Sequence, residues 1–303
     1  MRAVRLVGPR ELQVVEVAEP QAGPGEVLVR LRACGVCASD LNAWRGVPGI
    51  GYPLPAGAPG HETWGEVVGL GPGVDANGLS PGQRVTGLLW NGLAELGLAR
   101  AEDLVAIDLP LLGEPLACAI NVIRRAGPSE LVAFVGFGYL AALCAQVLPP
   151  GTRWLALSRR QESRALALRL GARAAYAFEE VPSELWDSVP VVVEAAGVQQ
   201  TLDFATWLTA YSGRLVLAGY HADGPRTVNM QSWNWKGIDV INAHGREPAV
   251  FVRALREGLR LIAERHLNPA ALQTHEFSLE DAAAAFRAAE ERPAGFVKAV
   301  VRL

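Results

Sequence analysis

One uncharged stretch, Leu131–Leu148, constrains the fold more than any other part of this sequence. It is long enough to span a membrane, but Gly136 and Gly138 interrupt it. An apolar strand that passes through a glycine turn into a buried helix gives the same pattern. We therefore expect a strand at Val132–Val135 followed by a helix from about Tyr139.

Apolar strands and helices go on alternating after this stretch, which predicts a doubly wound parallel sheet, an α/β fold. Further strands are expected at Arg153–Leu157, Val191–Glu194 and Arg214–Ala218, and helices at Gln161–Leu170 (closed by Gly171) and about Gln199–Thr209. The segment Trp233–Ile241 is predicted to be an apolar edge strand. Because such an edge needs covering, two chains are expected to pair there.

The first part of the chain has a different pattern, with short β segments between turns. Strands are expected at Leu12–Val17, Val27–Ala33, Glu66–Gly69 and Arg84–Leu89, a loop at Gly46–Gly60, two late helices at Ala249–Arg265 and Leu279–Glu291, and a last strand at Val297–Arg302. His266 and His275 would then lie on a late helical segment. We expect two domains, a mostly β domain from residues 1–118 and 244–303 and a dinucleotide-binding domain from residues 119–243.

Charge and composition exclude several classes of protein. The 28 Lys and Arg residues nearly balance 31 Asp and Glu residues, which argues against a nucleic-acid or anionic-membrane surface. Hydrophobic residues make up 50% of the chain, so disorder is excluded as its main state. Four cysteines are too few for a disulfide scaffold, and the start at Met1 has no apolar leader segment. We expect a cytoplasmic protein that does not bind a membrane.

The turn Gly136–Ala141 reads G-x-G-x-x-A between the expected strand and helix. The first glycine permits the tight turn, and the second lets backbone amides approach a pyrophosphate at the helix N-terminus. The alternative is a glycine-rich turn without a ligand. The residues expected to contact the dinucleotide here are Gly136, Phe137, Gly138, Tyr139 and Leu140.

The end of the next expected strand suggests which dinucleotide binds. NAD sites carry an acidic residue about 20 positions after the glycines, but Ser158 stands there, followed by Arg159 and Arg160. A small hydroxyl beside guanidinium groups suits a ribose 2′-phosphate, unless the arginines are merely solvated. We predict that NADP(H) is preferred over NAD(H).

A possible metal site is formed by Cys37, His61, Glu62 and Glu114, with Asp40 close by in the sequence. A thiolate, an imidazole and carboxylates that leave an open position are typical of catalytic zinc. Cys34 and Cys37 could instead form a redox pair, although no thioredoxin-like pattern surrounds them. Cys34, Cys118 and Cys144 are expected to be packing residues.

These motifs together resemble the medium-chain dehydrogenase/reductase superfamily, on its zinc-containing alcohol and polyol dehydrogenase side. The motifs that carry the resemblance, in order along Met1–Leu303, are G-V-C-A-S-D at 35–40, G-H-E at 60–62, G-Q-R-V at 82–85, E-P-L at 114–116, the glycine turn, and E-A-A-G at 194–197. The resemblance implies a GroES-like catalytic domain beside a Rossmann domain. The four-cysteine structural-zinc lobe of many relatives is absent, since no cysteine lies between Arg84 and Glu114.

The resemblance also implies roles for residues of this sequence. Cys37 and His61 would bind one catalytic zinc, with Glu62 as a direct or intermittent ligand and Glu114 at the remaining position, bonded to the zinc or through its water. Asp40 would orient His61. In such a site zinc acts as a Lewis acid on the alcohol oxygen, and a hydride passes to the nicotinamide.

Further roles concern the proton path and the cofactor. Ser39 would pass the substrate proton outward, but Asn42 stands where relatives often continue the relay with histidine. Lys298 matches a basic position near the cofactor pyrophosphate, and Ala218 ends a strand that faces the cofactor. The candidate substrate-pocket residues are Trp44, Trp90, Tyr220, His221 and His244, each of which could instead be a packing residue.

Three functions remain open on the sequence alone. We favour a zinc-dependent, NADP(H)-preferring alcohol or polyol dehydrogenase that forms a homodimer or homotetramer. The alternatives are a zinc-free quinone or enone reductase of the same superfamily and a non-catalytic nucleotide-binding protein. The combination of Cys37, His61 and Glu62 argues against both alternatives.

Overall fold

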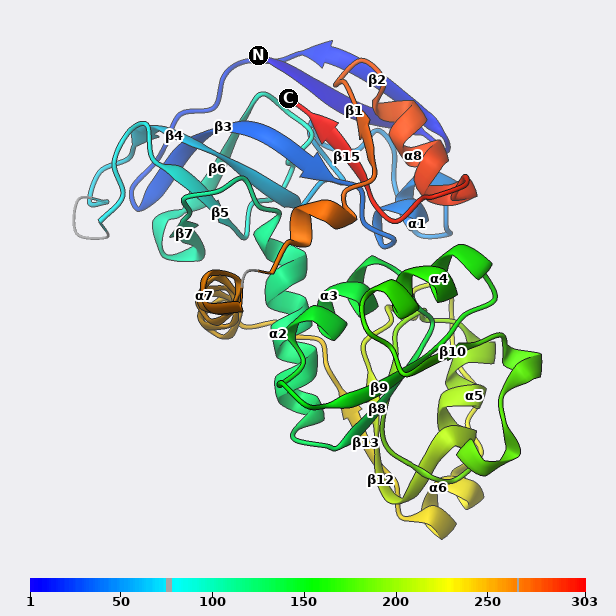
Figure 1. Ribbon diagram of the computed structural model, residues 1–303. Helices are drawn as coiled ribbons and strands as arrows, with labels where there is room; N and C mark the ends of the chain where they lie inside the picture. Colours follow the sequence, from blue (N-terminus) through cyan, green and yellow to red (C-terminus); the bar gives the residue numbers. More distant parts are fainter. Residues whose placement is uncertain (75–77, 266) are drawn as a thin grey trace. The chain divides into compact units, whose positions relative to one another are not determined.

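The computed structural model describes residues 1–74, 78–265 and 267–303, so the expected position of His266 lies outside the described residues (Figure 1). The chain divides into two compact units. Unit 1 comprises Met1–Ala117 and Glu247–Leu303, and unit 2 comprises Cys118–Arg246.

Unit 2 is built on a six-stranded sheet in the order β10-β9-β8-β11-β12-β13, and all neighbouring strands are parallel. The order reverses between β8 and β11, which is the point where doubly wound sheets bind ligands. The expectation of a doubly wound α/β sheet is confirmed. The strands are β8 (Leu131–Val135), β9 (Arg153–Leu157), β10 (Ala174–Tyr176), β11 (Val189–Glu194), β12 (Thr209–Leu217) and β13 (Asp239–Asn242).

Helices connect these strands, and the uncharged stretch is indeed a strand, a turn and a helix. Gly136 takes a φ of +85°, which glycine adopts without strain, and the helix begins at Tyr139. In the part of the chain that the structure describes, no helix is long and apolar enough to cross a membrane. The helices of this unit are α3 (Tyr139–Val147), α4 (Gln161–Arg169), α5 (Gln199–Leu208) and α6 (Met230–Lys236), and α2 (Gly113–Ala126) leads into it from unit 1.

The predicted edge strand Trp233–Ile241 is wrong over its first half, which is helix α6. The side chain of Asn229 accepts a hydrogen bond from the backbone N–H of Ser232 and caps this helix, while Gly237 ends it in the left-handed conformation. These two local signals outweigh the strand preference of the aromatic run. The last part of the predicted segment forms β13, which is one of the two edge strands of this sheet.

Unit 1 contains a sheet in the order β14-β15-β3-β4-β5-β7, with β6 also paired to β3, and a separate β1–β2 hairpin. Its mostly β character agrees with the expected GroES-like fold. The elements are β1 (Arg2–Gly8), β2 (Glu11–Glu16), β3 (Glu26–Gly35), β4 (Glu62–Leu70), β5 (Arg84–Gly87), β6 (Leu96–Arg100), β7 (Leu104–Ala106), β14 (His275–Phe277), β15 (Ala299–Arg302), and helices α1 (Asp40–Arg45), α7 (Pro248–Arg265) and α8 (Ala282–Glu291).

Several elements differ from the sequence expectation. His275 lies in β14, which pairs with β15 in parallel, and not on a helix. The short helix α1 was not expected. It begins at Asp40, soon after β3 ends at Gly35, and Asp40 is only 3% exposed. This position matters for the site described next.

Candidate functional site

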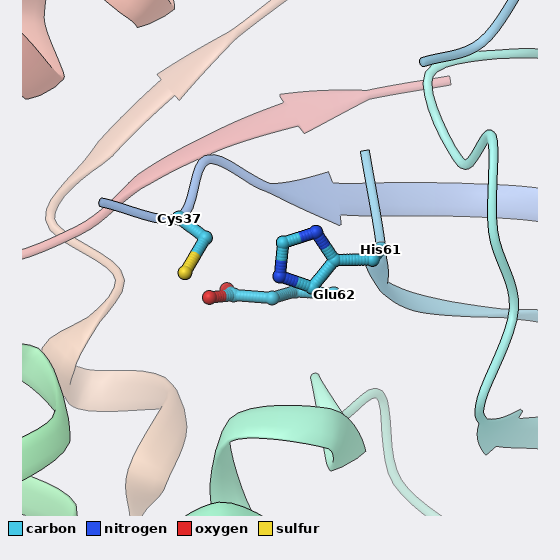
Figure 2. Close-up of side chains that lie close together, drawn as sticks. All are labelled: Cys37, His61 and Glu62. Carbon is cyan, nitrogen blue, oxygen red and sulfur yellow. The ribbon is translucent and has the colours of Figure 1, made fainter. Parts of the chain in front are cut away.

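The sheet of unit 1 brings Cys37 together with two consecutive residues from later in the chain, His61 and Glu62 (Figure 2). Strands β3 and β4 pair antiparallel, and Gly35 at the end of β3 lies opposite Glu62 at the start of β4. Cys37 follows the one strand and His61 precedes the other. One ligand atom from each of the three side chains lies within 4.8 Å of the others.

Asp40 fixes the orientation of the His61 ring. Its Oδ1 lies 3.2 Å from Nδ1 of His61, and the carbonyl oxygen of Pro59 lies at the same distance from that nitrogen. Asp40 Oδ2 accepts a hydrogen bond of 2.9 Å from the backbone N–H of Cys37. Because two acceptors face Nδ1, its proton belongs there and Nε2 keeps its lone pair. Figure 2 shows one ring nitrogen directed toward the sulfur of Cys37 and the carboxylate of Glu62.

Glu62 is 2% exposed and forms an ion pair with the buried ammonium group of Lys298. Lys298 Nζ donates to Oε1 at 2.6 Å and lies 2.5 Å from Oε2, so the ammonium group faces both oxygens of the carboxylate. Lys298 thus lies at the metal-ligand cluster, and its expected position near the cofactor pyrophosphate stays a prediction. The ammonium group and the carboxylate attract each other because their charges are opposite, and burial strengthens this attraction.

The donor set fits a catalytic zinc ion. Sulfur, nitrogen and oxygen donors converge from three side chains, which is a donor set that zinc binds, and the carboxylate of Glu62 among them is buried. Burial and then the negative charge of Glu62 raise the pKa of the Cys37 thiol. A divalent cation would reverse both effects, because it stabilises the thiolate and neutralises the carboxylate.

Among the described residues, Glu114 is not part of the group formed by Cys37, His61 and Glu62. It lies half-buried in the first turn of α2. Thr86 fixes that turn, since its Oγ1 accepts from the N–H of Gly113 at 2.9 Å and donates to the carbonyl of Thr63 at 2.6 Å. The turn is therefore tied to the strand that carries Glu62, but the Glu114 carboxylate does not join the three donors.

In unit 2 the glycine turn leads into the N-terminus of α3 and leaves space beside it. Gly138 is the N-cap of α3, and a Cβ atom placed there would contact nothing within 4 Å. Phe137 is buried and stacks on Trp154 at 5.5 Å, so only its backbone is available to a ligand. Tyr139 and Leu140, both half-buried, begin the helix.

At the end of β9, Ser158 is 8% exposed and its Oγ accepts a hydrogen bond from the N–H of Arg160 at 3.3 Å. Arg159 is exposed. Sequence reasoning missed Arg164, whose Nη1 donates to the carbonyls of Ser158 and Arg159 at 2.9 and 3.0 Å. Arg164 lies four residues, or one helical turn, after Arg160, and this spacing could have indicated that its side chain lies near the same strand end. The guanidinium group of Arg164 therefore lies against this strand end, which Arg159 and Arg160 follow in the sequence.

The two tryptophans predicted to line the substrate pocket differ in their exposure to solvent. Trp44 is a core residue and not a pocket residue: it is 1% exposed, packs on Phe286, and donates from its indole to Glu290 at 3.0 Å. Trp90 is 65% exposed, and its ring lies 5.8 Å from that of His61. Trp90 is thus an exposed apolar surface beside the metal-ligand group.

The remaining candidates lie at the carboxyl edge of the unit 2 sheet. Ala218 follows β12, and its N–H donates to the carbonyl of Glu194 at 2.8 Å. Tyr220 is 53% exposed and packs edge-on against His244 at 5.7 Å. Both ring nitrogens of His221 are engaged within the unit, one of them by Glu194 at 3.0 Å.

Comparison with known proteins agrees with this geometry. Residues 23–104 match the alcohol dehydrogenase GroES-like domain. The chain is 28% identical to a sorbitol dehydrogenase of Halalkalibacterium halodurans, over 90% of this chain and 91% of the relative. It is 25% identical to the (R,R)-butanediol dehydrogenase of Bacillus subtilis, over 93% of each. A structure from Sinorhizobium meliloti 1021, described as a zinc-binding dehydrogenase bound to NADP, superposes with a TM-score of 0.84 at 25% identity, covering 100% of this chain and 99% of that one.

Proposed function

We propose that this chain, which belongs to the medium-chain dehydrogenase/reductase superfamily, is a zinc-dependent oxidoreductase acting on alcohols or polyols. It would transfer a hydride between NADP(H) and the alcohol, or the corresponding ketone or aldehyde. The observation that carries this proposal is the convergence of Cys37, His61 and Glu62 on one point, with His61 oriented by Asp40. A zinc-free reductase has no use for such a donor set.

The chain's own residues prepare the site in defined ways. Cys37, His61 and Glu62 would hold the ion, which supplies Lewis acidity toward the substrate oxygen when bound. Asp40 keeps the imidazole in the tautomer that leaves Nε2 unprotonated. Ser39, two residues after Cys37, offers a hydroxyl that can carry a proton away from the site.

Lys298 and Glu114 adjust the charge around the donors. The ammonium group of Lys298 neutralises Glu62 while that carboxylate is not a ligand. Glu114 remains a proposed partner through water, because its carboxylate lies outside the group of three. Trp90 would contact the apolar face of a substrate whose oxygen approaches this group.

A substrate screen tests the activity. We expect the protein as purified to oxidise one or more members of a panel of alcohols, polyols and amino-cyclitols in the presence of NADP, followed as absorbance of the reduced nicotinamide. Elemental analysis of the same sample should give one zinc per chain. Turnover of quinones or enones by metal-free protein would favour the zinc-free reductase. A sample that binds the dinucleotide but reduces or oxidises nothing on the panel would favour a non-catalytic nucleotide-binding protein.

We also propose that two chains pair along β13, giving a homodimer or a tetramer built from dimers. This strand ends the sheet, and Val240 in it is 38% exposed. Light scattering at micromolar concentration should give the mass of two or four chains. Val240→Asp should shift the mass toward one chain, whereas Leu168→Asp on the exposed face of α4 should not. A monomeric unmodified protein would refute the pairing.

A further inference from the structure

The carboxylate of Glu194, the last residue of β11, is fully buried and receives hydrogen bonds on both oxygens. Oε1 accepts from the N–H groups of Ala196 and Gly197 at 2.9 and 2.7 Å and from the hydroxyl of Thr201 at 2.6 Å. Oε2 lies 3.0 Å from Nε2 of His221. Although burial alone raises it, these bonds hold the pKa of Glu194 below its usual value, so the group is a carboxylate.

The hydrogen bonds of His221 define its tautomer. Arg226 Nε, which can only donate, lies 2.9 Å from Nδ1, so Nδ1 is an acceptor without a proton. The ring proton is therefore on Nε2, where it is donated to Glu194. Both nitrogens are thus committed within the fold. His221 is a neutral bridge between a buried carboxylate and a guanidinium group, and it has no nitrogen left for a substrate.

The same contacts join the turns that follow β11 and β12. Arg226 Nη2 donates to the carbonyl of Gly197 at 2.7 Å, and it also contacts Asp223. The two turns pack backbone against backbone: a Cβ atom on Gly197 would lie 2.5 Å from the carbonyl oxygen of Tyr220, and one on Gly219 would overlap the backbone nitrogen of Gly197. The N–H groups of Ala218 and Gly219 also donate to the carbonyl of Glu194, each at 2.8 Å, so the bridge through His221 adds a side-chain link to turns that the backbone already joins.

The joined turns also contact the glycine turn. A Cβ atom on Gly136 would lie 2.6 Å from that of Ala196, so the turns after β8 and β11 abut at the reversal of strand order. In a sheet of this order, the strands on the β8–β10 side hold the adenosine half of a dinucleotide, and the strands on the β11–β13 side hold the other nucleotide. The network around Glu194 thus lies on the nicotinamide side.

We propose that His221 is a positioning residue: as a neutral bridge from Glu194 to Arg226, it fixes the turns that receive the nicotinamide half of the cofactor. The inference rests on the proposed function, because it takes the ligand of unit 2 to be a nicotinamide dinucleotide. It assigns His221 a role in cofactor binding in place of the substrate contact expected from the sequence. It also predicts that the two halves of the cofactor depend on His221 unequally.

Binding of the whole cofactor and of its adenosine half distinguishes this role from simple stabilisation. In the full-length protein, His221→Leu should weaken NADP binding by about 10- to 100-fold, the size of one or two lost polar contacts. Binding of adenosine 2′,5′-bisphosphate should change by less than about twofold, because its site lies on the β8–β10 side. His221→Gln, which offers a donor and an acceptor, should restore most of the NADP affinity. Both affinities can be measured by calorimetric titration.

Lys236 provides a matched control at the opposite edge of the sheet. Its side chain is 5% exposed, and its ammonium group donates to Asp187 at 2.6 Å and to the carbonyl of Thr206 at 2.7 Å. Lys236→Met should lower the melting temperature without changing the ratio of the two affinities. If His221→Leu does not fold, Arg226→Met removes the same bridge from its other end and should change the ratio in the same direction.

The outcomes separate the two proposals. Equal weakening of both ligands by the His221 variant, or no change in either, would overturn the positioning role and leave the proposed function standing. If the unmodified protein prefers NAD, the same ratio is measured with NAD and adenosine monophosphate. Binding of neither dinucleotide by the unmodified protein would overturn the proposed function and this inference together.

Discussion

Cys37→Ser is expected to strip the protein of zinc and to reduce kcat/KM by about 10³-fold or more. A hydroxyl is a poor replacement for a thiolate, because it stays protonated and binds the ion weakly. The loss of Lewis acidity removes several kcal/mol of transition-state stabilisation, which corresponds to that factor. Zinc per chain by elemental analysis and initial rates on the best substrate of the panel measure the two effects.

Cys34 offers a matched control, because it lies near the same strand end. Its side chain is fully buried, and burial raises the pKa of its thiol. It is not among the three residues whose donors converge. Cys34→Ala should therefore keep the zinc and most of the activity. Full zinc content and activity in Cys37→Ser, or two zinc ions per chain in the unmodified protein, would show that the metal site is misassigned.

The fold of unit 2 could be predicted because its signals are local. The glycines at 136 and 138 mark a turn, and the apolar runs on either side are long enough to identify a strand and a helix. The prediction of a strand at Trp233–Ile241 failed because it relied on the apolar pattern alone. There, a capping side chain at Asn229 and a left-handed Gly237 decide the structure, and the apolar pattern does not reveal them.

The candidate metal donors were accessible to sequence reasoning because each has distinctive chemistry and a short motif. The residues that surround these donors could not be predicted from the sequence. The ion pair between Glu62 and Lys298 joins residues 236 positions apart, brought together by the pairing of β15 with β3 and β3 with β4. Trp44 looked like a pocket aromatic, but only its packing against α8 shows that it is buried. Long-range pairing of this kind leaves no local trace in the sequence.

The cofactor preference is the second large effect that we expect. The unmodified protein should use NADP with a kcat/KM roughly ten- to a few hundred-fold above that for NAD, the size of one or two charge-assisted hydrogen bonds. After the end of β9, Ser158 stands where NAD sites carry an acidic residue. A carboxylate there would bind the ribose diol of NAD and repel the 2′-phosphate of NADP. Arg159 is exposed there, and Arg164 bonds the carbonyls of both residues, which stabilises the turn.

Ser158→Asp combined with Arg159→Ala should move the preference toward NAD, mostly through weaker binding of NADP. Aspartate can keep the hydrogen bond that Ser158 accepts from the N–H of Arg160, so the turn should survive while its charge is inverted. Arg153→Ala, at the opposite end of the same strand, is a control that should leave the preference unchanged. Equal efficiency with both cofactors, or an Arg159→Ala variant with undiminished NADP affinity, would mean that these guanidinium groups face solvent and that the phosphate, if bound, is held elsewhere.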